Sequence, residues 1–153
     1  MDINTCRVET QKHIDKVRKY LRFFTDKLTN RGEQHDAAKL ESPEVELFAE
    51  HTENLANLEY GSEEYKQELV ALKPALDHHY GIYRHHPEHF PNGINDMNLI
   101  DLVEMIADWK ASSERHNSGN LLKSIEINAQ RFSISEQLTQ ILINTAKMMD
   151  ENE

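Results

Sequence analysis

Residues 10–29, TQKHIDKVRKYLRFFTDKLT, carry the pattern that decides the fold class. Apolar side chains recur there three or four positions apart, which is the spacing of one face of an α-helix. They are Ile14, Val17, Leu21, Phe24 and Leu28. His13 lies at the edge of this stripe, on the side expected to face a core. Asn30-Arg31-Gly32 is typical of a helix end because glycine readily adopts a positive φ, so the first helix is expected to end there.

Helix start and stop signals continue along the chain, whereas strand signals are nearly absent. Ser42-Pro43 is typical of an N-cap followed by proline at the first helical position, and Gly61-Ser62 marks another start. Pro74 should break or restart the helix that follows, so residues 74–83 are expected to form a separate short segment. Residues 85–96, HHPEHFPNGIND, are rich in Pro, Gly and Asn and are expected to form an irregular loop.

Residues 98–110, NLIDLVEMIADWK, predict a later helix that Asn98 can cap. Three carboxylates share one face of this helix: Asp101, Glu104 and Asp108. Asp101 suits a capping role in the first turn. Asp108 lies in the most apolar part of the helix, so we expect it to point inward more than the other two.

The chain is therefore predicted to be all-α. We expect a single compact domain of about six helices over residues 1–150, followed by a frayed tail at 151–153. Two further amphipathic stretches, residues 121–132 and 138–149, complete the helix count. A chain of 153 residues is long enough to bury a real core.

Composition narrows the class of protein. The net charge of -10 argues against an extended nucleic-acid surface. No apolar run approaches the roughly 20 residues needed to span a bilayer, and the polar start does not resemble a secretory signal. Cys6 is the only cysteine, which excludes an internal disulfide. We expect a cytoplasmic protein with no membrane association.

His35-Asp36 is the strongest candidate for chemistry, because an adjacent imidazole and carboxylate can bind one divalent metal. The alternative is that Asp36 caps the next segment, and the two roles are compatible. His13 carries a similar pair of interpretations. It is either a metal ligand or a core histidine bonded to a backbone carbonyl, and spacing alone does not separate them.

Five of the nine histidines fall within twelve positions: His78, His79, His85, His86 and His89. Adjacent residues on a helix point about 100° apart, so one member of each adjacent pair can face a core. We expect His79 and His86 to point inward, and the four histidines of the two pairs are candidates to complete a second metal site. The alternative is an exposed histidine-rich loop that binds no metal. Imidazoles with carboxylates suit Mn, Fe, Co, Ni or Zn.

These residues resemble the HD-domain superfamily of metal-dependent phosphohydrolases. Its H…HD…D pattern on an all-α core matches His13, His35-Asp36 and Asp108 in order, and its HDxxK form matches His35 to Lys39. His79 and the HHPE block at 85–88 are similar to the additional histidines of two-metal members, which include cyclic-nucleotide phosphodiesterases.

The chain also resembles a small bacterial and phage branch without an assigned activity. The shared blocks are HDAAKLESPE at residues 35–44, ALDHHY at 75–80, RHHPEH at 84–89 and NLIDLVEMIADWK at 98–110. Residues 91–96 read PNGIND, where cyclic-di-GMP phosphodiesterases have a glycine-tyrosine-proline motif, which makes that substrate doubtful.

The resemblance implies one or two divalent transition-metal ions per chain. The implied ligands are His13, His35, Asp36, His79, His86 and Asp108. The implied reaction is hydrolysis of a nucleotide or another small phosphoester by metal-activated hydroxide. Asp36 would lie at the centre of catalysis. Lys39 would bind a phosphate oxygen with help from Arg84 or Arg18, and Glu88 or Glu104 would handle protons.

Two other functions stay open at this point. Some HD-like proteins carry two irons and oxygenate organic substrates with a similar ligand set. A non-catalytic binding module, stabilised by metal, is the other alternative. By analogy with HD domains, the chain could also form a homodimer.

Overall fold

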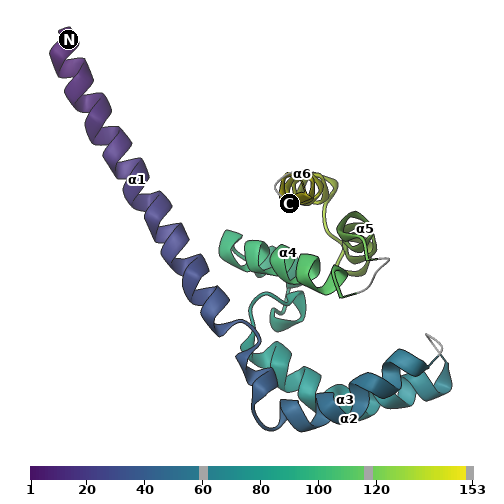
Figure 1. Cartoon of the computed structure of the whole chain (residues 1–153). Coiled ribbons are helices and arrows are strands. Elements are labelled where there is room, and N and C mark those ends of the chain that lie inside the picture. The colour runs from purple at the N-terminus through teal and green to yellow at the C-terminus, as the bar shows by residue number, and fades with distance from the viewer. Residues whose placement is uncertain (59–61, 116–118, 151–153) are drawn as a thin grey trace. The chain divides into compact units, whose positions relative to one another are not determined.

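The computed structural model describes residues 1–58, 62–115 and 119–150. Within these ranges the chain forms six α-helices and three short 3₁₀ helices, and it forms no strand (Figure 1). The all-α prediction of about six helices is therefore confirmed. The predicted tail at 151–153 and Gly61 lie outside the described residues. None of the described helices combines the length and the hydropathy that a bilayer span requires.

The chain divides into two units, residues Met1–Gln34 and His35–Glu153. The first unit is the helix α1, Ile3–Gln34, which buries none of its residues. This helix is longer than predicted at both ends. The prediction that it stops at Asn30-Arg31-Gly32 is wrong, because the helix passes through Gly32. A glycine inside a helix costs only about 1 kcal/mol relative to alanine, which a long helix can absorb.

The second unit begins with a short 3₁₀ helix, η1, Ala37–Leu40, and the helix α2, Glu44–Asn57. The prediction that Ser42 caps α2 is wrong. Pro43 occupies the N-cap position and makes no side-chain cap bond. The backbone N–H groups of Glu44 and Val45 instead donate to the carbonyl of Glu41, at 3.1 and 3.0 Å. The first-turn donors of α2 are thus satisfied without a serine side chain.

Helix α3, Glu63–Ile82, packs along α2 (Figure 1). Its N-cap is Ser62, whose hydroxyl accepts a hydrogen bond from the backbone N–H of Tyr65, as the start signal predicted. The predicted break at Pro74 is wrong, since α3 continues through it. A proline removes one hydrogen bond, to the carbonyl four residues earlier. That carbonyl belongs to Val70, which lies on the exposed side of the helix.

The connection from α3 to α4 contains two further 3₁₀ helices, η2 at Pro87–His89 and η3 at Gly93–Asp96. The segment predicted to be irregular is therefore partly ordered into tight turns. Gly93 adopts a positive φ of 57°, a conformation that glycine reaches without steric cost. His85 and His86 lie between the end of α3 and the start of η2, where His85 contacts Glu104 of α4.

The apolar core of the second unit lies among α4, Leu99–Ser113, α5, Leu121–Arg131, and α6, Glu136–Asp150. Its buried members are Met105, Ile106, Leu121, Ile125, Ile134, Leu142 and Ala146. The cap predicted for α4 is confirmed. Asn98 and Asp101 form a capping box, in which each side chain accepts from the other residue's backbone N–H.

Candidate metal centre

Asp36 has an unusual backbone that directs its side chain. Its φ is 54°, in the left-handed region, and it occupies the N-cap position of η1 without making a side-chain cap bond. The capping alternative for this carboxylate is therefore not what the structure shows. Instead, Oδ2 accepts from Lys39 Nζ at 2.5 Å. Left-handed conformations of residues other than glycine are uncommon and concentrate at functional sites.

Imidazoles from α3 and from the turn after it converge on the other oxygen of Asp36. His79 Nε2 lies 3.1 Å from Oδ1, and His85 Nε2 lies 3.4 Å from the same atom. His86 Nε2 lies 2.9 Å from His79 Nε2. His79 and His85 are each only 1% exposed, so this convergence takes place inside the protein.

The spacing of these atoms is compatible with ligands of one metal ion. Ligands at about 2.1 Å from one ion are roughly 3 Å apart when they occupy adjacent positions, close to the separations found here. Asp36 Oδ1 and both ring nitrogens of His85 are buried without any hydrogen-bond partner. The distances from His85 to Asp36 Oδ1 and to Glu104 Oε1 are short enough for hydrogen bonds, but the angles are unsuitable. Buried polar atoms without partners are costly, and a bound cation would satisfy them.

A second group of ligands lies on the other side of Asp36. His35 Nε2 is 3.7 Å from Asp36 Oδ2 and 3.6 Å from Asp108 Oδ1, a carboxylate on α4. Glu104, one turn earlier on α4, touches two imidazoles. Its Oε1 lies 3.0 Å from His35 Nδ1 and 3.1 Å from His85 Nδ1.

Within the described residues, three overlapping sets could each hold a metal ion, with ligand atoms within 4.8 Å of one another. They are Asp36, His79, His85 and His86; His35, His85 and Glu104; and His35, Asp36 and Asp108. The first and third sets share only Asp36. Both can be filled together if this carboxylate bridges, since its two oxygens face different histidines. The site can therefore accept one or two ions.

The charges at the site already compensate one another in the absence of metal. The carboxylates of Asp108 and, next in effect, Glu104 accept the protons of the His35 ring and raise the pKa of His35 to about 10. Burial alone would raise the pKa of Asp36, but His79, His85 and Lys39 outweigh it and hold that pKa well below its ordinary value. A metal that binds these ligands must displace protons from the imidazoles and take over their charge.

His86 differs from its neighbours in this respect. Burial, together with the electrostatic effect of the neighbouring imidazoles of His85 and His79, lowers the pKa of the His86 imidazole to about 3. A neutral imidazole is the form that binds a metal. His86 therefore needs no deprotonation before it acts as a ligand.

Among the residues predicted as ligands, the structure brings together five within the second unit: His35, Asp36, His79, His86 and Asp108. The predicted inward choice of His79 over His78 agrees with the exposure of the two residues. The prediction favours His86 over His85, but both belong to the candidate site, and His85 is the more buried. The prediction assumed a helix, in which adjacent side chains point about 100° apart. His85 and His86 lie in a turn, where both side chains can point toward the same site.

His13 is an exposed residue of α1, in the first unit. The expectation that it faces a core is not met within that unit, where no residue is buried. Its role as a ligand stays a prediction.

The relative burial of the three carboxylates on α4 differs from the prediction. Asp101 is fully buried and Glu104 is 8% exposed, whereas Asp108 is only partly buried. The expectation that Asp108 points inward more than the others is therefore wrong. Asp101 is enclosed because it both caps α4 and pairs with Arg84. The helical spacing of three carboxylates in the sequence does not reveal which of them has a capping contact or an arginine partner.

The residues predicted to assist catalysis have other contacts in the structure. Arg84 forms two hydrogen bonds with Asp101, at 3.1 and 3.0 Å, and stacks on Phe90. Glu88 pairs with Arg131 at 2.7 Å. Lys39 contacts Asp36 directly and is 37% exposed along its side chain. The catalytic roles of Arg84 and Glu88 stay predictions, while Lys39 is the cation nearest the ligands.

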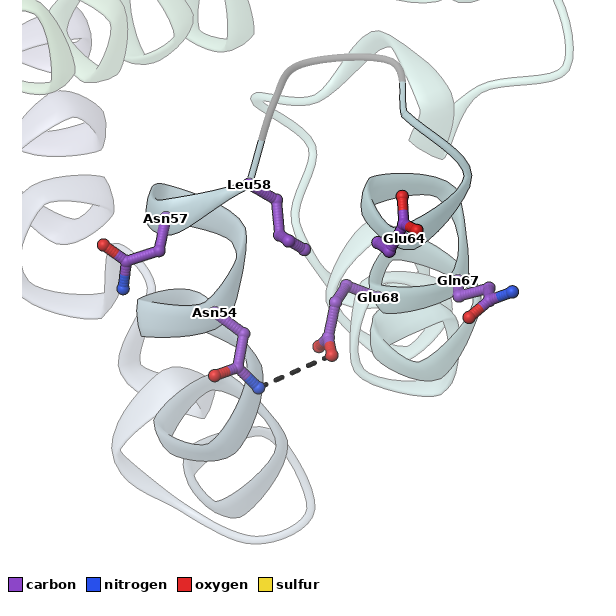
Figure 2. Close-up of a pocket in the computed structure, with 6 residues that line it drawn as sticks. All are labelled: Asn54, Asn57, Leu58, Glu64, Gln67 and Glu68. Atoms are coloured by element: carbon purple, nitrogen blue, oxygen red, sulfur yellow. Dashed lines mark hydrogen bonds between the residues drawn. The ribbon is translucent and has the colours of Figure 1, made fainter.

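A separate pocket lies between α2 and α3, away from these ligands (Figure 2). It is lined by Asn54, Asn57, Leu58, Glu64, Gln67 and Glu68. Asn54 Nδ2 donates to Glu68 Oε1 at 3.5 Å across it. The pocket shares no residue with any of the three ligand sets.

The comparisons with known proteins place the chain in a family without assigning it an activity. No curated protein and no solved structure matches it. One family model matches residues 2–148, which is nearly the whole chain and includes every ligand described above. The chain therefore belongs to the family of unknown function DUF5662.

Proposed function

We propose that the protein is a metal-dependent phosphohydrolase that acts on a nucleotide or another small phosphoester. The observation that carries the proposal is the convergence of His79, His85 and His86 on Asp36, whose Oδ1 atom is buried. Sites built from imidazole and carboxylate ligands suit Mn, Fe, Co, Ni and Zn. Such a metal would lower the pKa of a bound water and offset charge on phosphoryl oxygens.

The residues of the chain divide the remaining work. Asp36 presents one oxygen to each group of histidines and so ties the two groups together. Lys39, partly exposed beside Asp36, can contact a phosphate oxygen as a point charge. Glu104 touches Nδ1 of both His35 and His85, which directs their Nε2 atoms toward Asp36 and Asp108.

Elemental analysis tests the proposal first, on protein purified without chelator or histidine tag. We expect one or two transition-metal ions per chain, followed by turnover of a phosphoester in a screen of nucleotides. Hydrolysis should depend on the bound ion and disappear with a chelator. A chain that holds no metal after incubation with Mn, Fe, Co or Zn would overturn the proposal.

The same preparation distinguishes the di-iron oxygenase that the ligand set also suits. Two irons with mixed-valence spectra, oxygen consumption and no phosphoester turnover would favour that enzyme. Bound metal with neither activity would favour a metal-stabilised binding module.

A further inference from the structure

Glu44 is a buried carboxylate whose role the ligand sets do not explain. It is the first residue of α2 and is completely shielded from solvent. Burying a carboxylate is costly unless hydrogen bonds compensate. Both of its oxygens have such a partner on α3. Oε1 lies 2.7 Å from His78 Nδ1, and Oε2 lies 2.9 Å from His79 Nδ1.

These contacts determine where the proton of His79 resides. An ionised carboxylate only accepts hydrogen bonds, so Nδ1 of His79 must donate. In the neutral imidazole, Nε2 then carries a lone pair. That atom faces Asp36 Oδ1 at 3.1 Å and His86 Nε2 at 2.9 Å, in the centre of the candidate metal site.

We propose that Glu44 is a positioning residue that accepts the Nδ1 proton of His79 and thereby directs its Nε2 lone pair at the metal. The inference rests on the proposed function, because it assumes that this cluster binds a metal. Carboxylates that hold the outer nitrogen of a ligating histidine fix its tautomer and orientation, and their loss typically weakens metal binding about 10–100-fold.

His78 completes the arrangement from the solvent side. Its side chain is 42% exposed, and it occupies the second oxygen of Glu44. The carboxylate is thus held between two imidazoles from adjacent residues of one helix. This arrangement fixes the rotation of the carboxylate, so that Oε2 keeps its direction toward His79.

The same two helices offer a matched control. Glu68 on α3 accepts from His51 Nδ1 on α2 at 2.6 Å, which is again a glutamate–histidine contact between α2 and α3. Neither residue belongs to a ligand set. Replacing Glu68 should therefore perturb the packing of the two helices without changing the metal site.

The test is a Zn²⁺ titration of the full chain in three forms: unsubstituted, Glu44→Gln and Glu68→Gln. Glutamine keeps the size of the side chain but offers one oxygen acceptor for two Nδ1–H groups. We expect Glu44→Gln to weaken Zn²⁺ affinity about 10–100-fold, while Glu68→Gln leaves it unchanged. Equal affinity of Glu44→Gln and the unsubstituted chain would overturn the role of Glu44.

A second measurement needs no variant and covers the case in which Glu44→Gln does not fold. The ¹⁵N chemical shifts of His79 in the Zn²⁺-loaded chain report which ring nitrogen carries the proton. We expect Nδ1–H and a metal-bound Nε2. A protonated Nε2, or a metal bound through Nδ1, would overturn the proposal.

The two proposals fail in different ways. A chain that binds no divalent ion removes the metal centre, and the role of Glu44 falls with it. If the unsubstituted chain and Glu44→Gln bind Zn²⁺ with the same affinity, the metal centre stands and only the role proposed for Glu44 is rejected.

Discussion

The two ends of the second unit bury different kinds of side chain. Among α4, α5 and α6 the interior is apolar, with Met105 and Ile125 completely enclosed. Around α2, α3 and η2 the fully enclosed side chains of large volume are polar, namely Glu44, His79 and His85. Within the described residues, Leu72 and Ala75 of α3 and Pro87 of η2 add buried apolar side chains there.

Helix α4 belongs to both interiors. Glu104 faces the histidines, while the next two residues, Met105 and Ile106, belong to the apolar core. One part of this unit is therefore held together by burial of hydrocarbon. The other relies on compensation of charge, which a bound metal would complete. Variants in the two regions should therefore fail in different ways.

The largest effect is expected from Asp36→Ala, because this residue links both groups of ligands. It should lose metal and reduce phosphoester hydrolysis to background while retaining its helical circular dichroism, since the apolar core is untouched. Activity and metal content measured on the same folded sample check this. A folded, fully active variant would rule out the proposed centre.

Met105→Ala should show the opposite behaviour. Removing a large, completely buried side chain leaves a cavity and costs about 2–5 kcal/mol of unfolding free energy. Metal content at low temperature should stay unchanged. Urea denaturation and elemental analysis measure the two quantities, and a loss of metal from the folded variant would contradict the separation of the two interiors.

Metal removal should lower the free energy of unfolding, because the polar interior around Asp36 loses the cation that compensates its charges. At a free metal concentration 100 times the dissociation constant, binding contributes about 2.7 kcal/mol. For a chain of this size each kcal/mol shifts the melting temperature by about 2–4 °C. Thermal denaturation with and without chelator should show such a shift in the unsubstituted chain and none in Asp36→Ala. Equal shifts in both would place the metal elsewhere.

His86→Ala should produce the smallest and most selective change. His86 belongs to the first ligand set but not to the third. If both sets are filled, its loss should lower the metal content by about one ion and leave the other in place. Elemental analysis of the folded variant decides this, and an unchanged count would favour a single ion bound near His35.

Periodicity predicted the helices well because it depends on residues that are close in sequence. The caps at Ser62 and Asn98 are of this kind, since each bonds a backbone group within three residues. The failures at Gly32 and Pro74 have one cause. A local helix-breaking preference of a few kcal/mol was outweighed by the rest of a long helix.

The candidate site was predictable only in part. The histidine and carboxylate side chains were visible as motifs, and five of the predicted ligands lie together. Glu44 carried no signal, because a glutamate after proline is typical of any helix start. The prediction of His86 alone misses His85, because a turn, unlike a helix, lets two adjacent histidines face the same site.

The sequence by itself determined that the chain is helical, where most helices begin, and which side chains can bind a metal. Only the tertiary structure decided which of them meet. Asp36 is far from His79 along the chain, and His35 is far from Glu104. Their contacts depend on how the segment before η1 packs with α3 and α4. Such convergence arises from the burial of surface on different helices, which no local spacing encodes.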